Sequence, residues 1–197
     1  MITAIVLAAG KSERMGRPKM LLPFGRKTLI ETVLAGVRRS RIDDVIVVLG
    51  AHREAIEPVI SKLAFRTVFN KDFGAGMLSS VLWGLHEVPA AAQAFLVVLG
   101  DHPSPPASVI DRLIAAHERT GKGIVLPVYR GRRGHPILID TRYREEVTAL
   151  DPSIGLRQLL GDHPADVLEV SVRTPAVLVD VDRPDDYRKA LNSRRRR

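Results

Sequence analysis

The sequence contains no cysteine and few aromatic residues, and each shortage excludes a class of protein. Without cysteine, the chain forms neither a disulfide framework nor a thiolate metal site. Aromatic residues make up only 5% of the chain, so the stacking platforms that bind single-stranded nucleic acid are poorly supplied. The first apolar run, MITAIVLAAG, has no positive leader and is too short to cross a bilayer. We therefore expect a cytoplasmic protein that binds neither membrane nor nucleic acid.

The net charge of +8 nevertheless calls for an anionic partner. Part of this excess lies in the terminal run SRRRR, residues 193–197, which we expect to be a disordered basic tail. The other basic residues are spread along the chain, and an anionic small substrate fits them as well as nucleic acid does. A chain of 197 residues is long enough for one well-cored domain. We expect that domain to cover residues 1–192.

Four short apolar runs separated by helical patterns predict an α/β fold. Their apolar residues are consecutive rather than alternating, as is typical of strands covered on both faces. The runs are residues 4–9, 44–50, 94–101 and 123–128. Apolar residues at helical spacing lie between them, at Leu29, Val33 and Val37, at Met77, Val81 and Leu85, and at Val109, Leu113 and Ala116. This alternation predicts a single three-layer, Rossmann-like domain with a mostly parallel sheet.

The second half of the chain is less regular. Residues 135–139, 166–172 and 176–182 are predicted to be further strands, some of them at an antiparallel edge, and residues 183–191 a closing helix. In open α/β sheets, ligands bind beyond the carboxyl ends of the strands. This rule places the candidate site in the segments that follow the apolar runs, which are residues 10–19, 50–53, 70–76 and 100–103.

The segment LAAGKSERMGRPK, residues 7–19, combines two glycines with four basic residues and one acid. It matches neither G-x-x-x-x-G-K-[ST] nor G-x-G-x-x-G. Residues 8–10 (Ala-Ala-Gly) let the backbone N–H groups approach an anion closely. Arg14 offers a two-pronged contact to phosphate and Lys19 a point charge. The alternative is a basic surface turn, but the small residues and the density of positive charge favour a phosphate-binding loop.

Acidic residues follow two later strands of the prediction. Asp101, in VVLGDHPSPP, is placed to bind a divalent cation beside phosphates, or else to cap a helix that begins near residues 104–107. Asp180 and Asp182, in AVLVDVDRPDDY, are two residues apart and therefore point to the same face of a strand. One of them can join Asp101 at a shared metal. The alternative is a pair of solvated acids near the start of a helix.

Asn70, Ser79 and Ser80 form a weaker candidate set in FNKDFGAGMLSS. Their amide and hydroxyl groups can form hydrogen bonds with a base, a ribose or a phosphate. The alternative is a purely structural role, in a loop and at the cap of a helix. The six histidines contain no H-x-x-x-H pair, which argues against a histidine zinc site. His102 and His135 lie at the edges of the predicted site.

Three segments in this order, LAAGKSERMGRPK, GDHP and DVDRPDDY, resemble the MobA-like NTP transferase family. They are most similar to its molybdenum cofactor cytidylyltransferase branch. Members begin with a strand and L-A-(A/G)-G-x-S-x-R-M-G-x-x-K, carry G-D-x-P in the middle and end with a D-x-D-x-P-x-D-type segment. The likeness covers essentially the whole chain, and NKDFGAGMLSS, RGHPI and GLRQLL are also similar to that branch.

The resemblance implies Mg²⁺-dependent transfer of CMP from CTP to the terminal phosphate of the molybdenum cofactor (molybdopterin), with release of pyrophosphate. It also implies a transient contact with a molybdenum enzyme. It makes Arg14, Lys19 and Asp101 catalytic, and it makes Asp101 and Asp182, or Asp180 in its place, the metal ligands. The implied nucleotide-binding residues are Leu7, Ala8, Ala9, Gly10, Arg14, Lys19, Asn70, Ser80 and Asp101.

Two positions bear on specificity within the family. Alanine at position 9, rather than glycine, is similar to the enzymes that use cytidine rather than guanosine nucleotides. At position 102 the branch often has Gln or Met, whereas this chain has His. That departure leaves the choice of acceptor open and makes His102 and His135 candidates for the acceptor side.

Three other functions fit parts of the same pattern. One is a nucleotidyltransferase that uses GTP or acts on another phosphorylated acceptor. Another is a non-catalytic carrier or chaperone that delivers the finished cofactor to molybdenum hydroxylases. The third is a nucleic-acid-binding module that depends on the basic terminus. Catalysis is favoured because a carrier has little use for the combination of Lys19, Asp101 and Asp182.

Overall fold

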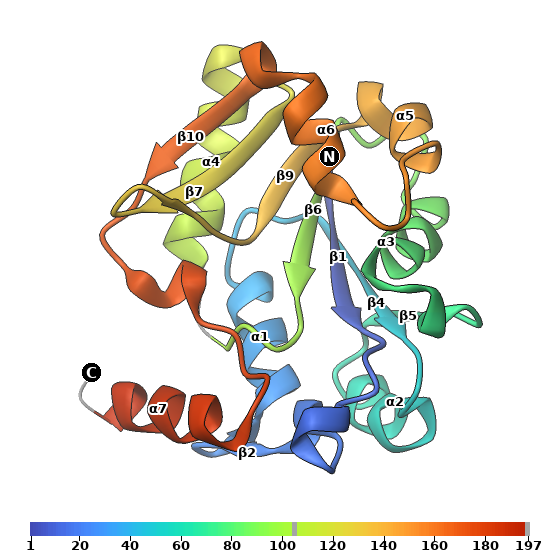
Figure 1. The fold of residues 1–197 in the computed structure, drawn as a ribbon, viewed down its shortest axis with the longest axis vertical. Helices are drawn as coiled ribbons and strands as arrows, with labels where there is room; N and C mark the ends of the chain where they lie inside the picture. The colour runs from blue at the N-terminus through green and yellow to red at the C-terminus, as the bar shows by residue number, and fades with distance from the viewer. Residues whose placement is uncertain (104–105, 196–197) are drawn as a thin grey trace.

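The computed structural model describes residues 1–103 and 106–195, in which one large sheet is covered by helices (Figure 1). Within these residues, eight strands form the main sheet. Seven follow the spatial order β10 (Val167–Ser171), β7 (Ile124–Tyr129), β9 (Ile137–Asp140), β6 (Ala94–Leu99), β1 (Ile2–Ala8), β4 (Asp44–Leu49) and β5 (Arg66–Phe69). The eighth, β8 (Arg132–Arg133), pairs with β7, and a separate hairpin joins β2 (Pro23–Phe24) to β3 (Lys27–Thr28).

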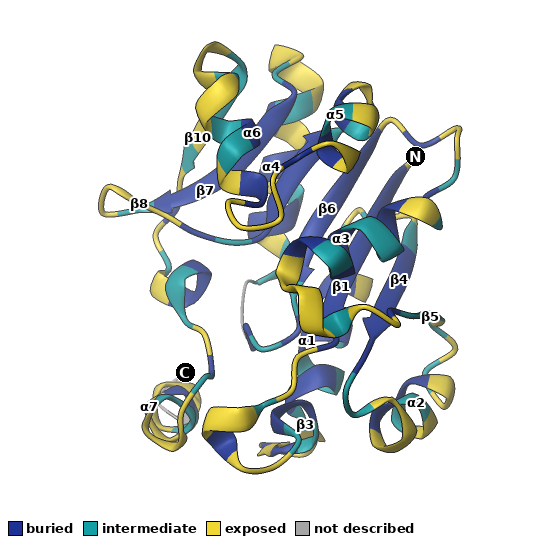
Figure 2. Ribbon diagram, turned by 45° about the vertical axis from the view of Figure 1, so that its right-hand side comes forward, coloured by how far each residue is buried: buried dark blue, intermediate teal, exposed yellow. Residues whose placement is uncertain are grey.

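The helices divide between the two faces of this sheet. Side chains of α1 (Leu29–Arg38), α2 (Arg53–Ser61) and α4 (Ala107–Thr120) pack in one apolar cluster, and those of α3 (Met77–His86), α5 (Arg144–Thr148) and α6 (Leu156–Asp162) in the other. In β1, Ala4 and Val6 belong to the first cluster, and Ile5 and Leu7 belong to the second. Figure 2 shows the buried strands between these two helical layers. The three-layer α/β prediction is confirmed.

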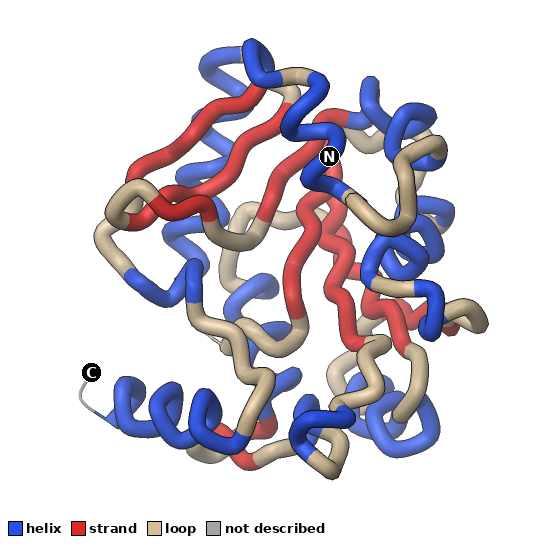
Figure 3. The backbone as a smooth tube through the Cα atoms, viewed as in Figure 1, coloured by secondary structure: helices blue, strands red, loops and turns tan. Residues whose placement is uncertain are grey.

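The sheet is mostly parallel, with one reversal inside it. β1 runs parallel to β4 and β6, β4 parallel to β5, and β10 parallel to β7. β9 is antiparallel to both of its neighbours, β6 and β7. The sequence predicts antiparallel strands at an edge, whereas β9 lies inside the sheet, between β6 and β7. The carboxyl ends of β1, β4, β5 and β6 therefore share one end of the sheet, where Figure 3 shows their loops.

Local chemistry explains where two of the helices begin. Thr28 caps α1 in a capping box, because its hydroxyl accepts from the Glu31 N–H while the Glu31 carboxylate accepts from the Thr28 N–H at 2.6 Å. α3 follows Gly76, whose φ of +102° and ψ of −178° are readily adopted only by glycine. Among the described residues, no helix has both the length and the apolar composition needed to span a bilayer.

The predicted strand over residues 176–182 is wrong. Its first half forms a 3-10 turn, η6 (Pro175–Leu178), which begins at a proline and is capped by the Thr174 hydroxyl accepting from the Ala176 N–H. The second half is extended but forms no ladder; one backbone bond, from the Val181 N–H to the Asp101 carbonyl (3.1 Å), fixes its position. Val177 and Val181 are fully buried, so the apolar run serves the core without entering the sheet.

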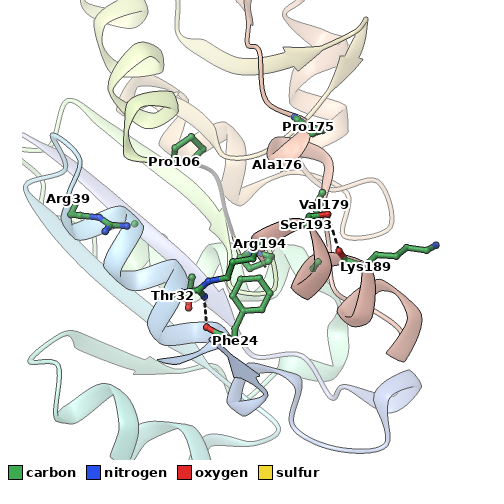
Figure 4. A pocket seen from close by; sticks show the side chains of 13 residues that line it. Phe24, Thr32, Arg39, Pro106, Pro175, Ala176, Val179, Lys189, Ser193 and Arg194 are labelled. Atoms are coloured by element: carbon green, nitrogen blue, oxygen red, sulfur yellow. Dashed lines mark hydrogen bonds between the residues drawn. The ribbon is translucent and has the colours of Figure 1, made fainter. Parts of the chain in front are cut away.

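The predicted closing helix is present, but it extends into the expected tail. α7 (Pro184–Arg195) continues three residues past Asn192. The Arg194 guanidinium donates to the Phe24 carbonyl (Figure 4). It also lies 4.9 Å from the centroid of the Phe24 ring. These contacts hold Arg194 against the domain, whereas residues 196–197 lie outside the described part. A cavity of about 340 Å³ separates α7 from α1 and η6.

The close approach of α3 to β1 and β4 gives a test of the packing. A Cβ added at Gly84 would overlap Ile5 Cγ2 and lie 3.0 Å from Val48 Cγ2. We expect Gly84→Ala to lower the free energy of unfolding by about 1–3 kcal/mol in urea denaturation. The matched control is Gly161→Ala in α6, where the added methyl meets nothing within 4 Å. That change should raise stability by up to about 1 kcal/mol, and equal effects at both sites would contradict the packing.

Candidate active site

The segment after β1 folds back on itself and returns Lys19 to the end of the sheet. Ser12 adopts a left-handed conformation (φ 56°) before the 3-10 turn η1 (Glu13–Met15). The Met15 side chain is buried and anchors this turn to the domain. The Ser12 hydroxyl then accepts a hydrogen bond from the Lys19 N–H at 3.2 Å, at the start of η2 (Lys19–Leu21). The loop is therefore a closed cradle rather than an open surface turn.

Lys19 brings together two acids that are far away in the sequence. Its Nζ lies 2.5 Å from Asp101 Oδ2 and 2.8 Å from Asp182 Oδ1, across 82 and 163 residues of chain. Asp101 lies two residues after the end of β6, and the Val181–Asp101 backbone bond holds Asp182 beside it. Arg14 adds a fourth charged group, with its Nη2 2.9 Å from Asp182 Oδ2. Two cations and two carboxylates thus converge at the carboxyl ends of the strands.

Because these charged groups are partly buried, each one strongly affects the pKa of its neighbours. The Lys19 side chain is 10% exposed and that of Asp101 18% exposed. Burial alone would lower the pKa of Lys19, but the charge and hydrogen bond of Asp101, together with those of Asp182, outweigh it and raise that pKa. Burial alone would likewise raise the pKa of Asp182, but Lys19 and Arg14 bring it below its usual value. The shifts in these two pKa values favour the ionised forms of Lys19 and Asp182 at neutral pH.

Two adjoining cavities open onto these charges. The first, of about 310 Å³, is mainly apolar and is lined by Leu7, Ala9, Gly10, Lys19, Met20, Phe73, Gly76, Met77, Ser80, Leu99 and Asp101. The second, of about 370 Å³, is polar and is lined by Gly10, Lys11, Ser12, Glu13, Arg14, Lys19, Phe73, Gly74, Gly76 and Asp182. They share Gly10, Lys19, Phe73 and Gly76. An apolar chamber joined at a lysine to a basic one fits a ligand with a flat ring at one end and several negative charges at the other.

The predicted residues of the strand end divide between two surfaces. Leu7, Ala9 and Gly10 line the apolar cavity. Ala8 does not, because side chains alternate along β1 and this one packs in the core beneath α1 and α2. Only the backbone of Ala8 is therefore near the cavity.

Asn70 and Ser80 lie together but play different parts. The Asn70 amide is fully buried and donates to Ser79 Oγ (3.0 Å) and Ser80 Oγ (2.9 Å), while its Oδ1 accepts from the Asp72 N–H (2.8 Å). With these bonds made, Asn70 fastens the 70–76 loop to α3 and has no donor left for a ligand. Ser80 lines the apolar cavity and accepts from Asn70, so its own hydroxyl proton is available to a ligand.

The two candidate acids near the C-terminal end are clearly distinguished. Asp182 faces Lys19 and Arg14 with both of its carboxylate oxygens. Asp180 is exposed and forms no hydrogen bond or ion pair within the described part of the chain. The expected same-face relation of residues two apart depended on a strand that does not form here. Only Asp182 is thus placed to share a cation with Asp101.

His102 and His135 form a buried aromatic pair beside this site. Their ring centroids are 5.6 Å apart at an interplanar angle of 84°, and the Nδ1 atom of each is buried without a hydrogen-bond partner in the described chain. His135 lines a further cavity of about 340 Å³, together with Met77 and Arg157. Met77 also lines the apolar cavity, so the two hollows adjoin. His102 is 5% exposed and is not among the residues that line that cavity.

Because of this histidine pair, we expect the free energy of unfolding to fall in acid. Burial, reinforced by the charge of His102, lowers the pKa of His135 to about 4. The unfolded chain, with a histidine pKa of about 6.5, takes up this proton first as the pH falls. We expect acidification from pH 7 to pH 5 to cost the wild type about 2 kcal/mol more than it costs His135→Gln. Urea denaturation of both proteins at the two pH values measures this difference, and parallel losses would contradict it.

Phe73 is a site residue that the sequence did not single out. It is half-buried on η3 (Phe73–Ala75), whereas its neighbours from Lys71 to Met77 are exposed. It lines both chambers and also a third hollow beside α2. An isolated aromatic residue in a polar, glycine-rich loop next to a predicted ligand-binding edge was the available signal.

Comparison with known proteins agrees with this geometry. The MobA-like NTP transferase domain matches residues 4–167. Nicotine blue oxidoreductase of Paenarthrobacter nicotinovorans is 33% identical over 193 residues, which cover 91% of this chain and 92% of that protein. Molybdenum cofactor cytidylyltransferase of Escherichia coli K12 is 28% identical over 188 residues, covering 94% and 93%.

A solved structure adds a similar fold that contains a metal. A protein of Mycobacterium tuberculosis H37Rv, determined in complex with manganese, superposes with a TM-score of 0.84 at 29% identity, covering 98% of both chains. The match to the family domain spans most of the present chain, including the loop after β1 and Asp101. The chain therefore belongs to the MobA-like NTP transferase family.

Proposed function

We propose that this nucleotidyltransferase transfers CMP from CTP to the terminal phosphate of the molybdenum cofactor in the cytoplasm, with Mg²⁺ and release of pyrophosphate. The observation that carries the proposal is the convergence of Asp101 and Asp182 on one cationic nitrogen beside the loop after β1. Two carboxylates that already hold a cation form a donor set that suits Mg²⁺. The 28% identical cytidylyltransferase and alanine at position 9 support CTP as the nucleotide.

The reaction requires charge neutralisation more than proton transfer. An oxygen of the acceptor phosphate forms a bond to the α-phosphorus of CTP, and the bond from that phosphorus to the bridging oxygen breaks, so pyrophosphate leaves with the electron pair. A phosphate acceptor is already anionic near pH 7 and needs no strong general base. Lys19 and Arg14 are placed to neutralise the phosphate oxygens and align them. Mg²⁺, when held by Asp101 and Asp182, supplies further neutralisation of the leaving group.

The cavities suggest where each substrate lies. The apolar chamber between Ala9 and Phe73 suits the cytosine ring, with the Ser80 hydroxyl as a donor to it. The basic chamber with Arg14 suits the triphosphate. The hollow that contains His135 and Arg157 adjoins the apolar chamber and suits the organic part of the acceptor. A transient contact with a molybdenum enzyme, to hand over the product, belongs to the same proposal.

An assay with four nucleotides tests the proposal. Each NTP is incubated with the protein, Mg²⁺ and isolated molybdenum cofactor, and both pyrophosphate and the nucleotide-bearing product are measured. We expect release with CTP and little with ATP, GTP or UTP. A preference for GTP, or turnover only with another phosphorylated acceptor, would overturn the assigned substrates. Nucleotide binding without pyrophosphate release from any acceptor would instead indicate a carrier.

The 33% identical relative supports a second candidate, an oxidoreductase that acts on nicotine blue. The apolar chamber would then receive the substrate, but a redox reaction would make no use of the two carboxylates. Consumption of NADH or NADPH that depends on nicotine blue and needs no NTP is the result expected for this candidate. Pyrophosphate release without such consumption favours the transferase.

A further inference from the structure

The Lys19 ammonium lies between Asp101 and Asp182 and bridges their carboxylates. It lies within hydrogen-bond distance of one oxygen from each carboxylate, at 2.5 Å and 2.8 Å. The second oxygen of Asp182 is engaged by Arg14 at 2.9 Å. A metal ion that takes the same two oxygens, Asp101 Oδ2 and Asp182 Oδ1, has to displace the Lys19 ammonium from them.

Burial makes this bridge more than a loose surface pair. The Lys19 side chain is 10% exposed, and those of Asp101 and Asp182 are 18% and 28% exposed. A partly buried carboxylate that loses its cation carries a desolvation cost, which another cation offsets. When Lys19 leaves the two carboxylates, a second cation is therefore needed to neutralise the acids, and an anion is needed to neutralise the lysine.

A metal–triphosphate complex supplies both at once. Its phosphate oxygens are acceptors for Lys19 and Arg14, which line the basic chamber at the same place as Asp182. Its metal is then available to Asp101 and Asp182. A free divalent cation offers nothing to the displaced lysine, and a free triphosphate offers nothing to the acids.

We propose that Lys19 is an internal substitute for the divalent cation, so that Asp101 and Asp182 bind metal tightly only when a triphosphate engages Lys19 and Arg14. This inference rests on the proposed function only in its metal–triphosphate site, not in the identity of the base or the acceptor. It makes Lys19 both a phosphate-binding residue and a gate against metal alone. Metal and nucleotide consequently bind with positive coupling.

Binding of Mn²⁺ to the full-length protein without nucleotide tests the gate. Free Mn²⁺ is followed by electron paramagnetic resonance for the wild type, Lys19→Met and Lys11→Met. We expect Lys19→Met to bind Mn²⁺ at least about tenfold more tightly than the wild type. Lys11→Met is the matched control, because Lys11 is an exposed loop lysine that pairs with Glu13 and not with the acids. The double variant Lys19→Met/Asp182→Asn should lose the gain, which locates the metal at these carboxylates.

The outcomes separate this inference from the proposed function. Equal Mn²⁺ affinity in the wild type and Lys19→Met would overturn the gate even if CMP transfer is observed. A tenfold gain would uphold it even if the nucleotide or the acceptor proves to be another. Lys19→Gln, which keeps a hydrogen-bond donor for the acids, is the second variant if thermal melting shows that Lys19→Met does not fold. Wild-type binding of Mn²⁺ alone at about micromolar Kd, lost in Asp182→Asn, would also overturn it.

Discussion

Asp101→Asn is expected to lower kcat for nucleotidyl transfer at least about a hundredfold while the fold persists. The change removes a negative charge that faces Lys19 at 2.5 Å and that we assign to the metal. The backbone bond between the Asp101 carbonyl and the Val181 N–H remains, so the position of Asp182 is kept. Pyrophosphate release at saturating CTP and Mg²⁺ measures the loss, and circular dichroism checks the fold.

Asp180→Asn is the matched control for this experiment. Asp180 is an exposed acid of the same segment, two residues before Asp182. The two changes remove the same charge from the protein, but only Asp101 is in contact with Lys19. We expect activity close to that of the wild type in Asp180→Asn, and a large loss in Asp182→Asn. Near-normal activity in Asp101→Asn would remove the basis for a carboxylate-held metal.

The second large effect is expected at Lys19, where replacement by methionine should lower kcat/KM at least about a hundredfold. Methionine has a similar length and fills the same space, so the loss reports the missing charge. Lys19 is the residue that lines both chambers and also contacts both acids. Initial rates over a range of CTP concentrations give the two constants separately.

Comparison with Lys11→Met distinguishes charge at this point from charge in the loop. Lys11 is half exposed, lies 3.6 Å from Glu13 and lines the basic chamber without contacting either acid, so its replacement should lower kcat/KM much less than that of Lys19. A purely structural Lys19 would give a different pattern, in which Lys19→Met lowers the melting temperature but retains its kcat/KM below that temperature. Such a result would refute a role in phosphate binding.

Much of the fold was predictable because its signals are local. Consecutive buried residues such as those of β1 and β6, and the helical spacing of Leu29, Val33 and Val37, depend only on neighbours in the chain. The carboxyl-end rule then placed Arg14, Lys19 and Asp101 at one edge. The strand predicted at residues 176–182 failed because apolar composition does not reveal that Pro175 and Thr174 begin a turn.

The sequence by itself determined the three-layer α/β fold, and it predicted a basic loop after the first strand and candidate acids after two later ones. Only the tertiary structure distinguished Asp182 from Asp180 and placed Lys19 between two carboxylates. It also showed that the Asn70 side chain, a candidate for ligand binding, hydrogen-bonds its loop to α3 instead. The physical reason is distance along the chain. Contacts across 82 and 163 residues are set by the order of strands in the sheet, which no local periodicity records.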